Sequence, residues 1–225
     1  MKTKFIVLVL TVFISFSSKA QDVCNAYYPF EEGAKFEITN FNKKGKKEGY
    51  VSYEVTNVDN NVASLETKIF DTKGKEITTT GYDVTCEGNS ISIDFKSLMS
   101  PEIFTKYKDM DVDMTGTNVE FPKELEVGKT LKDANMQMAI NMSGMKMNMT
   151  INMINRKVDA QESITTPAGT FDCYVLSYTS EMKMGVKYTF TIKEWVAEGV
   201  GMVKNETYNK KGNLMSYSEL TKFSK

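Results

Sequence analysis

The chain has 225 residues, 28 lysines and arginines, 29 aspartates and glutamates, and a formal net charge of −1 at pH 7. Its one arginine, Arg156, argues against nucleic-acid binding, because phosphate and base recognition depends on clustered arginine and lysine. It has no histidine, which removes most nucleophilic, acid–base and mixed-ligand metal sites. We therefore expect a protein that is not an enzyme and that needs no cofactor.

The first 20 residues have the features of a secretory signal peptide. Two lysines precede an apolar run, Phe5–Phe16, that is shorter than the roughly 20 residues a bilayer span needs. Small residues then occupy the positions that a signal peptidase reads, so cleavage is predicted before Gln21. We expect residues 1–20 to be a signal peptide and residues 21–225 to form a single β-rich domain. This domain would be periplasmic or secreted in a Gram-negative bacterium, with no transmembrane segment after cleavage.

Three cysteines remain in the predicted mature chain, and export would permit a disulfide bond. Cys24 lies near the start of this chain, Cys86 ends a strand-like run, and Cys173 lies within another. We favour a disulfide between Cys24 and Cys86, with Cys173 free and buried, although spacing alone does not determine connectivity. A lipid anchor on Cys24 is not expected, because Val23 stands where a lipidated cysteine requires a small residue.

The rest of the chain reads as β-strands separated by turns. The strand-like runs are rich in Val, Ile, Thr, Tyr and Phe. We expect strands at Ala34–Phe41, Gly49–Val58, Val62–Asp71, Glu76–Cys86, Ser90–Phe95, Asp111–Val119, Asn135–Met142, Met145–Ser163, Phe171–Met182, Val186–Val196, Gly201–Tyr208 and Asn213–Leu220. One turn pattern occurs at Phe41–Lys46, Phe70–Lys75 and Tyr208–Asn213. In each, Asn or Asp starts the turn and a glycine takes the positive φ that closes it.

Only one segment reads as a helix, Ser97–Tyr107, with Pro101 admissible in its first turn. About a dozen strands with one short helix predict a mainly β protein. The expected architecture is a large curved antiparallel sheet or open half-barrel.

A methionine-rich hairpin is predicted at Met136–Met153. Side chains two residues apart share one face of a strand, and the phase changes at the Ser143-Gly144 turn. This methionine face carries Met136, Met138, Ile140 and Met142 on one strand, and Met145, Met147, Met149, Ile151 and Met153 on the other. Met182 and Met184, two apart on a nearby strand, would extend the same face.

Several segments together resemble a known group of proteins. They are Cys24 with Tyr28-Pro29-Phe30 and Gly33, Asn155–Val158, Thr166–Cys173, and Trp195 with Gly199–Lys204. In this order they resemble the TapB-like group of uncharacterised secreted proteins from Bacteroidota, over nearly the whole mature chain. The resemblance implies a curved sheet or half-barrel similar to the periplasmic lipoprotein carriers LolA and LolB, with a helix over one opening. It implies no activity and no catalytic residue.

Three functions remain open for the methionine face. The favoured one is an apolar groove on the concave side of the sheet that binds a lipid, or a lipid-modified partner such as a lipoprotein, because methionine adapts to varied ligand shapes. Its predicted ligand-binding residues are Met136, Met138, Met142, Met145, Met147, Met149, Met153, Met182, Met184 and Trp195. Alternatively, the methionines pack the core of a structural or partner-binding envelope protein. In the third interpretation, Met142, Met145, Met147 and Met149 bind Cu(I) through their thioethers.

Arg156 and Trp195 each have a structural and a functional interpretation. Arg156 could clamp a carboxylate, but a structural ion pair or the anchor of a β-bulge is favoured. Trp195 could cover a ligand, but a core tryptophan at a strand end is favoured. The oligomeric state is not predicted.

Overall fold

The computed structural model describes residues 27–88, 90–99, 101–107, 110–142 and 145–225. The predicted signal peptide, its cleavage site and Cys24 lie outside these residues. Within them, no helix is long and apolar enough to cross a membrane.

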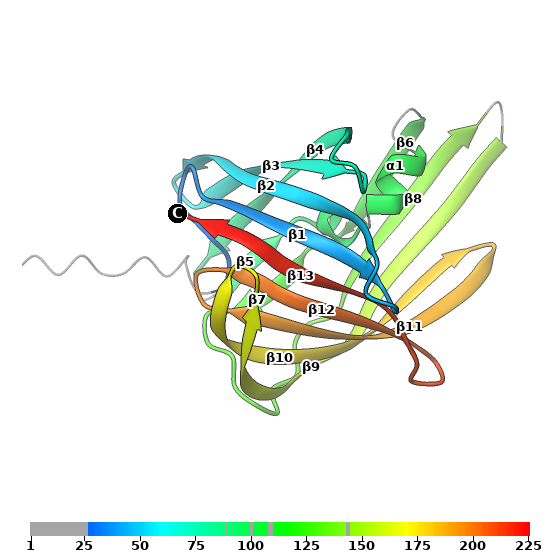
Figure 1. Ribbon diagram of the computed structural model, residues 1–225. Helices are drawn as coiled ribbons and strands as arrows, with labels where there is room; N and C mark the ends of the chain where they lie inside the picture. The colour runs from blue at the N-terminus through cyan, green and yellow to red at the C-terminus, as the bar shows by residue number, and fades with distance from the viewer. Residues whose placement is uncertain (1–26, 89, 100, 108–109, 143–144) are drawn as a thin grey trace, which may run out of the picture.

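A single antiparallel sheet of 13 strands makes up most of the described chain (Figure 1). The mainly β prediction is therefore confirmed. The strands are β1 (Lys35–Asn42), β2 (Lys47–Asp59), β3 (Val62–Phe70), β4 (Glu76–Glu87), β5 (Ser90–Ile93), β6 (Asp111–Thr117), β7 (Val119–Pro122), β8 (Ala134–Met142), β9 (Met145–Thr166), β10 (Gly169–Met184), β11 (Val186–Ala197), β12 (Gly201–Asn209) and β13 (Leu214–Ser224).

The sheet curls into a nearly closed barrel because one short segment supplies both of its edges. The strand order is β6-β8-β9-β10-β11-β12-β13-β1-β2-β3-β4-β5-β7. β6 and β7 stand at opposite ends of this order, yet only Asn118 separates them in the chain. The single strand predicted at Asp111–Val119 is thus corrected: the chain leaves β8 at Thr117 and joins β5 at Val119.

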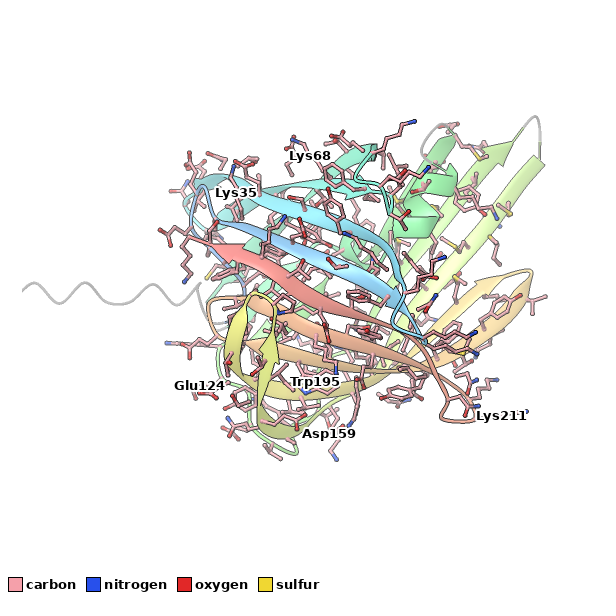
Figure 2. All side chains as sticks on the ribbon, viewed as in Figure 1. Lys35, Lys68, Glu124, Asp159, Trp195 and Lys211 are labelled. Atoms are coloured by element: carbon pink, nitrogen blue, oxygen red, sulfur yellow. The ribbon has the colours of Figure 1, made fainter. Side chains whose placement is uncertain are left out.

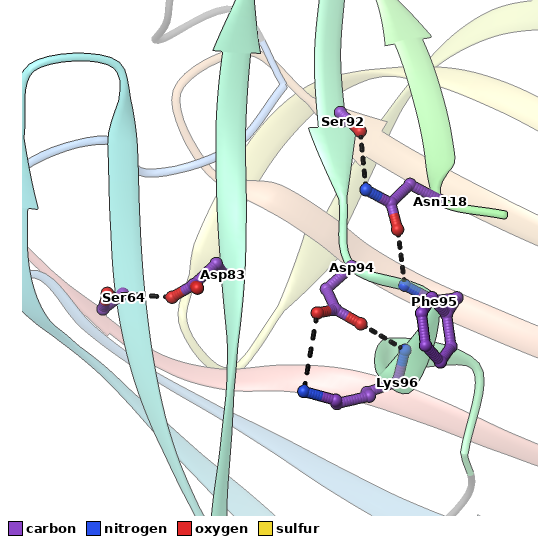
Figure 3. A network of polar contacts seen from close by, with 7 residues as sticks. All are labelled: Ser64, Asp83, Ser92, Asp94, Phe95, Lys96 and Asn118. Carbon is purple, nitrogen blue, oxygen red and sulfur yellow. Dashed lines mark hydrogen bonds and ion pairs between the residues drawn. The ribbon is translucent and has the colours of Figure 1, made fainter. Parts of the chain in front are cut away.

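Side chains around Asn118 hold this crossover in place (Figure 3). Asn118 Nδ2 donates to Ser92 Oγ on β5 at 3.0 Å, and Asn118 Oδ1 accepts from the Phe95 backbone N–H at 3.1 Å. Asp94 Oδ1 accepts from the Lys96 backbone N–H at 2.8 Å and so caps the following helix. One asparagine therefore ties the crossover to β5 and to the helix that follows β5.

The three repeated turns form as predicted, with the same bonds in each. Asn42 Oδ1 accepts from the backbone N–H groups of Lys44 and Lys46, and Asp71 and Asn209 accept equivalent pairs. The glycines of these turns, Gly45, Gly74 and Gly212, have φ angles of 75°, 81° and 76°. The left-handed glycine and the Asx bonds explain why each hairpin closes at this position.

The predicted helix at Ser97–Tyr107 is two short helices, which corrects the single one expected. They are the 3-10 helix η2 (Phe95–Leu98) and α1 (Pro101–Tyr107). Pro101 begins α1, where a missing N–H has no cost. Leu98, Met99 and Tyr107 pack on the methionine face, so these helices cover one part of the inner side of the sheet.

The structure describes two of the three cysteines of the predicted mature chain. Cys86 is disulfide-bonded, and Cys173 is free and buried, as predicted. The predicted partner Cys24 lies outside the described residues, so the pairing stays a prediction.

Candidate functional site

A cavity of about 360 Å³ lies inside the barrel. We call it the interior cavity. Strands distant in sequence line it, because antiparallel neighbours on a curved sheet direct alternate side chains inward. Its apolar lining includes Phe36 and Ile38 from β1, Ile151 and Met153 from β9, Leu176 from β10, Ile192 from β11 and Met202 from β12. The volume falls at the lower end of the range for small-molecule pockets, roughly 300–1,000 Å³.

Tyrosines form one wall of the interior cavity. The Phe36 and Tyr53 rings are stacked with centroids 4.5 Å apart, and the hydroxyls of Tyr28 and Tyr82 form a hydrogen bond. Burial raises the pKa of Tyr53 to about 12 and raises those of Tyr28 and Tyr82 further. The wall is therefore uncharged at neutral pH, which suits an apolar ligand.

Besides Ser97 and Ser180, a group of four polar side chains interrupts the apolar lining. We call them the polar patch: Arg156, Tyr178, Glu194 and Asn205. Glu194 on β11 lies directly opposite Asn205 on β12. The Tyr178 hydroxyl on β10 donates to Glu194 Oε2 at 3.2 Å. With Arg156 on β9, four adjacent strands thus bring their polar side chains to one region of the cavity.

A β-bulge turns Arg156 into the barrel. Asn155 has a φ of 57°, and the two residues Asn155 and Arg156 oppose the single residue Tyr178 on β10. The Asn155 backbone N–H donates to Asp133 Oδ1 at 3.0 Å, which supports the left-handed conformation. The extra residue changes the inward phase of β9 from odd-numbered to even-numbered positions. The favoured interpretation of Arg156 as a bulge anchor is therefore confirmed.

The Arg156 guanidinium is held at one nitrogen. Arg156 is 2% exposed, and its Nη1 donates to the backbone carbonyls of Glu120 at 3.0 Å and Lys132 at 2.6 Å. The guanidinium also lies over the Phe121 ring, 5.1 Å from the centroid. Among the described residues, its Nε and Nη2 groups have no hydrogen-bond acceptor, so they remain available to a ligand in the cavity.

Burial and charge oppose each other in the polar patch. Burial raises the pKa of Glu194, and Arg156 together with the Tyr178 hydroxyl acts against this rise. Burial likewise lowers the pKa of Arg156, and the Glu194 charge counters that. Within the described residues the two groups make no salt bridge within 4.0 Å. They face the same cavity without touching.

The methionine face lies mostly outside the interior cavity. The hairpin pairs as predicted, with Met138 opposite Met149 and Ile140 opposite Met147. Met136, Met138 and Met149 are buried in a packed cluster with Tyr107 of α1, and Met147, Met182 and Met184 pack against it. Of the predicted ligand-binding methionines whose side chains the structure describes, only Met153 lines the cavity. The side chains of Met142 and Met145 lie outside the described residues.

The structure does not bring Trp195 to the cavity. Its Nε1 donates to Glu162 Oε1 at 2.6 Å, and Lys193 and Lys204 lie over its ring. Sequence reasoning missed Tyr178, Glu194 and Asn205 as cavity residues. A signal was present, because Tyr178 shares the strand phase of Leu176 and of Met182.

Comparisons with known proteins agree on the fold. The model of the family described as DUF3108-like matches residues 31–220. A protein from Bacteroides fragilis NCTC 9343, inferred to be exported and with a YmcC-like fold, is 22% identical with a TM-score of 0.78. That alignment covers 90% of this chain and 100% of the other.

A protein from Parabacteroides distasonis ATCC 8503, inferred to be a lipoprotein, has a TM-score of 0.75. It is 22% identical, and the alignment covers 89% of this chain and 99% of the other. No curated protein matches the chain. None of these matches is described as TapB-like or as a LolA or LolB carrier.

Proposed function

The chain belongs to the DUF3108-like family, and we propose that it is an exported, non-enzymatic domain that binds an apolar ligand, such as a lipid or the acyl chain of a lipid-modified partner, in the interior cavity. The observation that carries this proposal is the cavity itself, which lies within the curved sheet and is lined mainly by apolar and aromatic side chains. Such a lining with a few convergent polar groups is typical of small-molecule sites.

Export is part of the proposal. The charged, apolar and small-residue regions of residues 1–20 support it, as do the descriptions of the two solved neighbours as exported and as a lipoprotein. The resemblance to the TapB-like group and to LolA and LolB carriers is consistent with the same place and role. We propose that the mature domain works in the bacterial envelope.

The ligand site proposed here differs from the methionine-lined groove expected first. Met136, Met138 and Met149 are packed against one another and against Tyr107, so they leave little room for a ligand. The cavity begins where the hairpin continues toward Ile151 and Met153. Methionine still contributes through Met153 and Met202, but tyrosine and aliphatic side chains supply most of the surface.

Two other functions remain as alternatives. The packed methionine cluster favours the structural or partner-binding interpretation for that part of the chain, because buried methionines there serve as core. The structure gives less support to Cu(I) binding, since Met149 is fully buried among apolar neighbours rather than directed at a shared site. The free thiol of Cys173 does not line the cavity, so the proposal assigns it no chemistry.

A cavity-filling substitution tests the proposal. The mature protein, purified from an envelope fraction, is examined by native mass spectrometry and then titrated with the neutral apolar fluorophore N-phenyl-1-naphthylamine. Ser180 lines the cavity, so Ser180→Trp should weaken fluorophore binding at least tenfold. Thr191→Trp, on an exposed position of the neighbouring strand β11, is the matched control and should bind like the wild type. A wild-type protein with no lipid mass and no fluorophore binding would refute the proposed function.

A further inference from the structure

We propose that the polar patch recognises a neutral head group that carries both a hydrogen-bond acceptor and a donor, as in an acyl amide, and discriminates against fatty-acid anions. This inference rests on the proposed function, since it names the class of ligand that the interior cavity takes. The observation behind it is that Arg156 and Glu194 face one cavity without pairing directly.

Arg156 supplies the donors. A guanidinium has five N–H donors, and the two on Nη1 point to the carbonyls of Glu120 and Lys132. The Nε and Nη2 donors remain, on a side chain that is 2% exposed and that lines the cavity. These donors have no protein acceptor among the described residues, so a carbonyl oxygen of a ligand in the cavity can accept from them.

Glu194 supplies the acceptor. Its Oε2 already accepts from the Tyr178 hydroxyl, and Asn205 lies beside it on β12. Oε1 has no hydrogen-bond donor among the described residues. A ligand N–H placed between the two charged groups can donate to Glu194 while the adjacent carbonyl accepts from Arg156. One amide group can thus form hydrogen bonds with both Arg156 and Glu194.

A carboxylate head group fits this patch less well than an amide. It would pair with Arg156, but it would also bring a second negative charge close to the partly buried Glu194, and like charges repel. It offers no donor to Glu194 either. Binding sites built around buried polar groups discriminate in this way, because the wrong ligand leaves one of those groups unpaired.

Two probes that differ only in the head group test the inference. Octanamide and octanoate each displace N-phenyl-1-naphthylamine from the mature protein at pH 7.5. The wild type should bind octanamide at least tenfold more tightly than octanoate. Glu194→Gln removes the negative charge at constant shape, so octanoate binding should strengthen at least tenfold while octanamide stays within about threefold. Glu198→Gln, at an exposed position outside the cavity, is the control and should match the wild type.

The outcomes separate the two proposals. Equal affinity of the wild type for both probes, or unchanged octanoate binding by a folded Glu194→Gln variant, would overturn the head-group inference while fluorophore binding still supported an apolar ligand. If neither probe nor the fluorophore binds, the proposed function itself fails. Circular dichroism of each variant confirms that it is folded, and the wild-type comparison needs no substitution at all.

Independently, we infer that one end of the barrel contacts an anionic lipid surface. In an antiparallel barrel, alternate turns meet at the same end. The three repeated turns therefore lie together and bring the exposed lysines Lys43, Lys44, Lys73, Lys75, Lys210 and Lys211 to one end. Figure 2 shows Lys211 at this end and Glu124 away from it. We call this surface the basic end.

Apolar side chains project beside these lysines. The β10–β11 hairpin ends there, and Val186 and Tyr188 are 64% and 50% exposed. Acidic groups at the basic end are partly engaged: Glu181 pairs with Lys187 at 2.7 Å, and Asp71 accepts two backbone N–H groups of its turn. Glu48 and Glu76 are exposed at the basic end too, but exposed lysines outnumber them there. Turns at the opposite end carry exposed acids such as Asp59 and Glu87. Exposed lysines around exposed apolar side chains suit an anionic bilayer surface.

Vesicle sedimentation tests the second inference. The mature protein should bind vesicles that contain phosphatidylglycerol, lose most of that binding at 0.5 M salt, and ignore phosphatidylcholine vesicles. Changing Lys73, Lys75, Lys210 and Lys211 to glutamine should weaken binding at least tenfold. The same change at Lys35, Lys129 and Lys225, which lie away from the basic end, should have little effect. The inference would be overturned if the protein bound no vesicles, which would mean that this surface has no lipid partner. Tighter binding to soluble polyglutamate than to the vesicles would also overturn it, in favour of an acidic protein partner.

Discussion

The position of Arg156 depends on one backbone conformation. Asn155 takes a φ of 57°, which asparagine adopts more readily than most residues. Without the extra residue of the bulge, the period of two would direct Arg156 away from the cavity. The sequence indicated a bulge or an ion pair at this arginine, but it could not indicate which strands would face it. Tyr178, Glu194 and Asn205 approach it through pairings between segments far apart in the chain.

At the residue scale, we predict that the Cys173 thiol is unreactive in the folded protein. Burial, with smaller contributions from Asp172 and Glu162, raises its pKa to about 11. At pH 8 roughly one thiol in a thousand would then be the reactive thiolate. Labelling with 5,5′-dithiobis(2-nitrobenzoate) at pH 8 should therefore be on the order of 100-fold slower in buffer than in 6 M guanidinium. Complete labelling of the native protein within minutes would contradict this prediction.

At the scale of single elements, strand positions were predictable, but the crossover between β6 and β7 was not. The predicted strand at Val62–Asp71 differs from β3 by one residue, because alternation and turn chemistry mark both of its ends. β7 was not recognised as a separate strand, since its four residues follow β6 after a single asparagine. Its existence depends on pairing with β5, a contact that no local pattern indicates.

Because the same turn occurs three times, its stabilising hydrogen bonds can be tested at equivalent residues. Asn209→Ala removes the acceptor of two backbone hydrogen bonds, from Lys211 and Asn213. The expected loss in the free energy of unfolding is about 1 kcal/mol, as for other lost side-chain caps. Asn42→Ala should cost a similar amount, and Lys44→Ala, which removes no such acceptor, should cost less than about 0.5 kcal/mol. Urea denaturation measures all three, and equal stability of Asn209→Ala and the wild type would disprove the role of the cap.

We predict that side-chain volume, rather than the sulfur atom, is what the packed methionine cluster requires. Met138 is fully buried between β8, β9 and the covering helices. Met138→Ala should lower the free energy of unfolding by roughly 2–5 kcal/mol, because it removes buried atoms and leaves a cavity. Met138→Leu should cost less than about 1.5 kcal/mol, since the volumes are close. Guanidinium denaturation distinguishes the two, and an alanine variant as stable as the wild type would show that this cluster is not tightly packed.

At the scale of the whole molecule, the sequence predicted a curved sheet but not what the curvature encloses. The period of two correctly placed Met136 and Met153 on one face, yet that face divides between a packed cluster and the cavity lining. The division follows from where η2 and α1 lie, which depends on contacts between distant segments. Likewise, lysines that look scattered in separate turns gather at one end only after the strands pair.

We predict that Asn118 stabilises the crossover that closes the barrel. Asn118 links Ser92 of β5 and the backbone of Phe95 at the crossover between the two sheet edges. Asn118→Ala should lower the free energy of unfolding by about 1–2 kcal/mol and speed amide hydrogen exchange selectively in β5, β6 and β7. The matched control is Ser64→Ala, which removes a 2.8 Å bond to Asp83 between β3 and β4 (Figure 3). Because β3 and β4 stay paired with each other in this variant, amide hydrogen exchange in β5, β6 and β7 should not change. Uniform acceleration across all strands by Asn118→Ala would mean that the crossover opens only when the whole barrel unfolds.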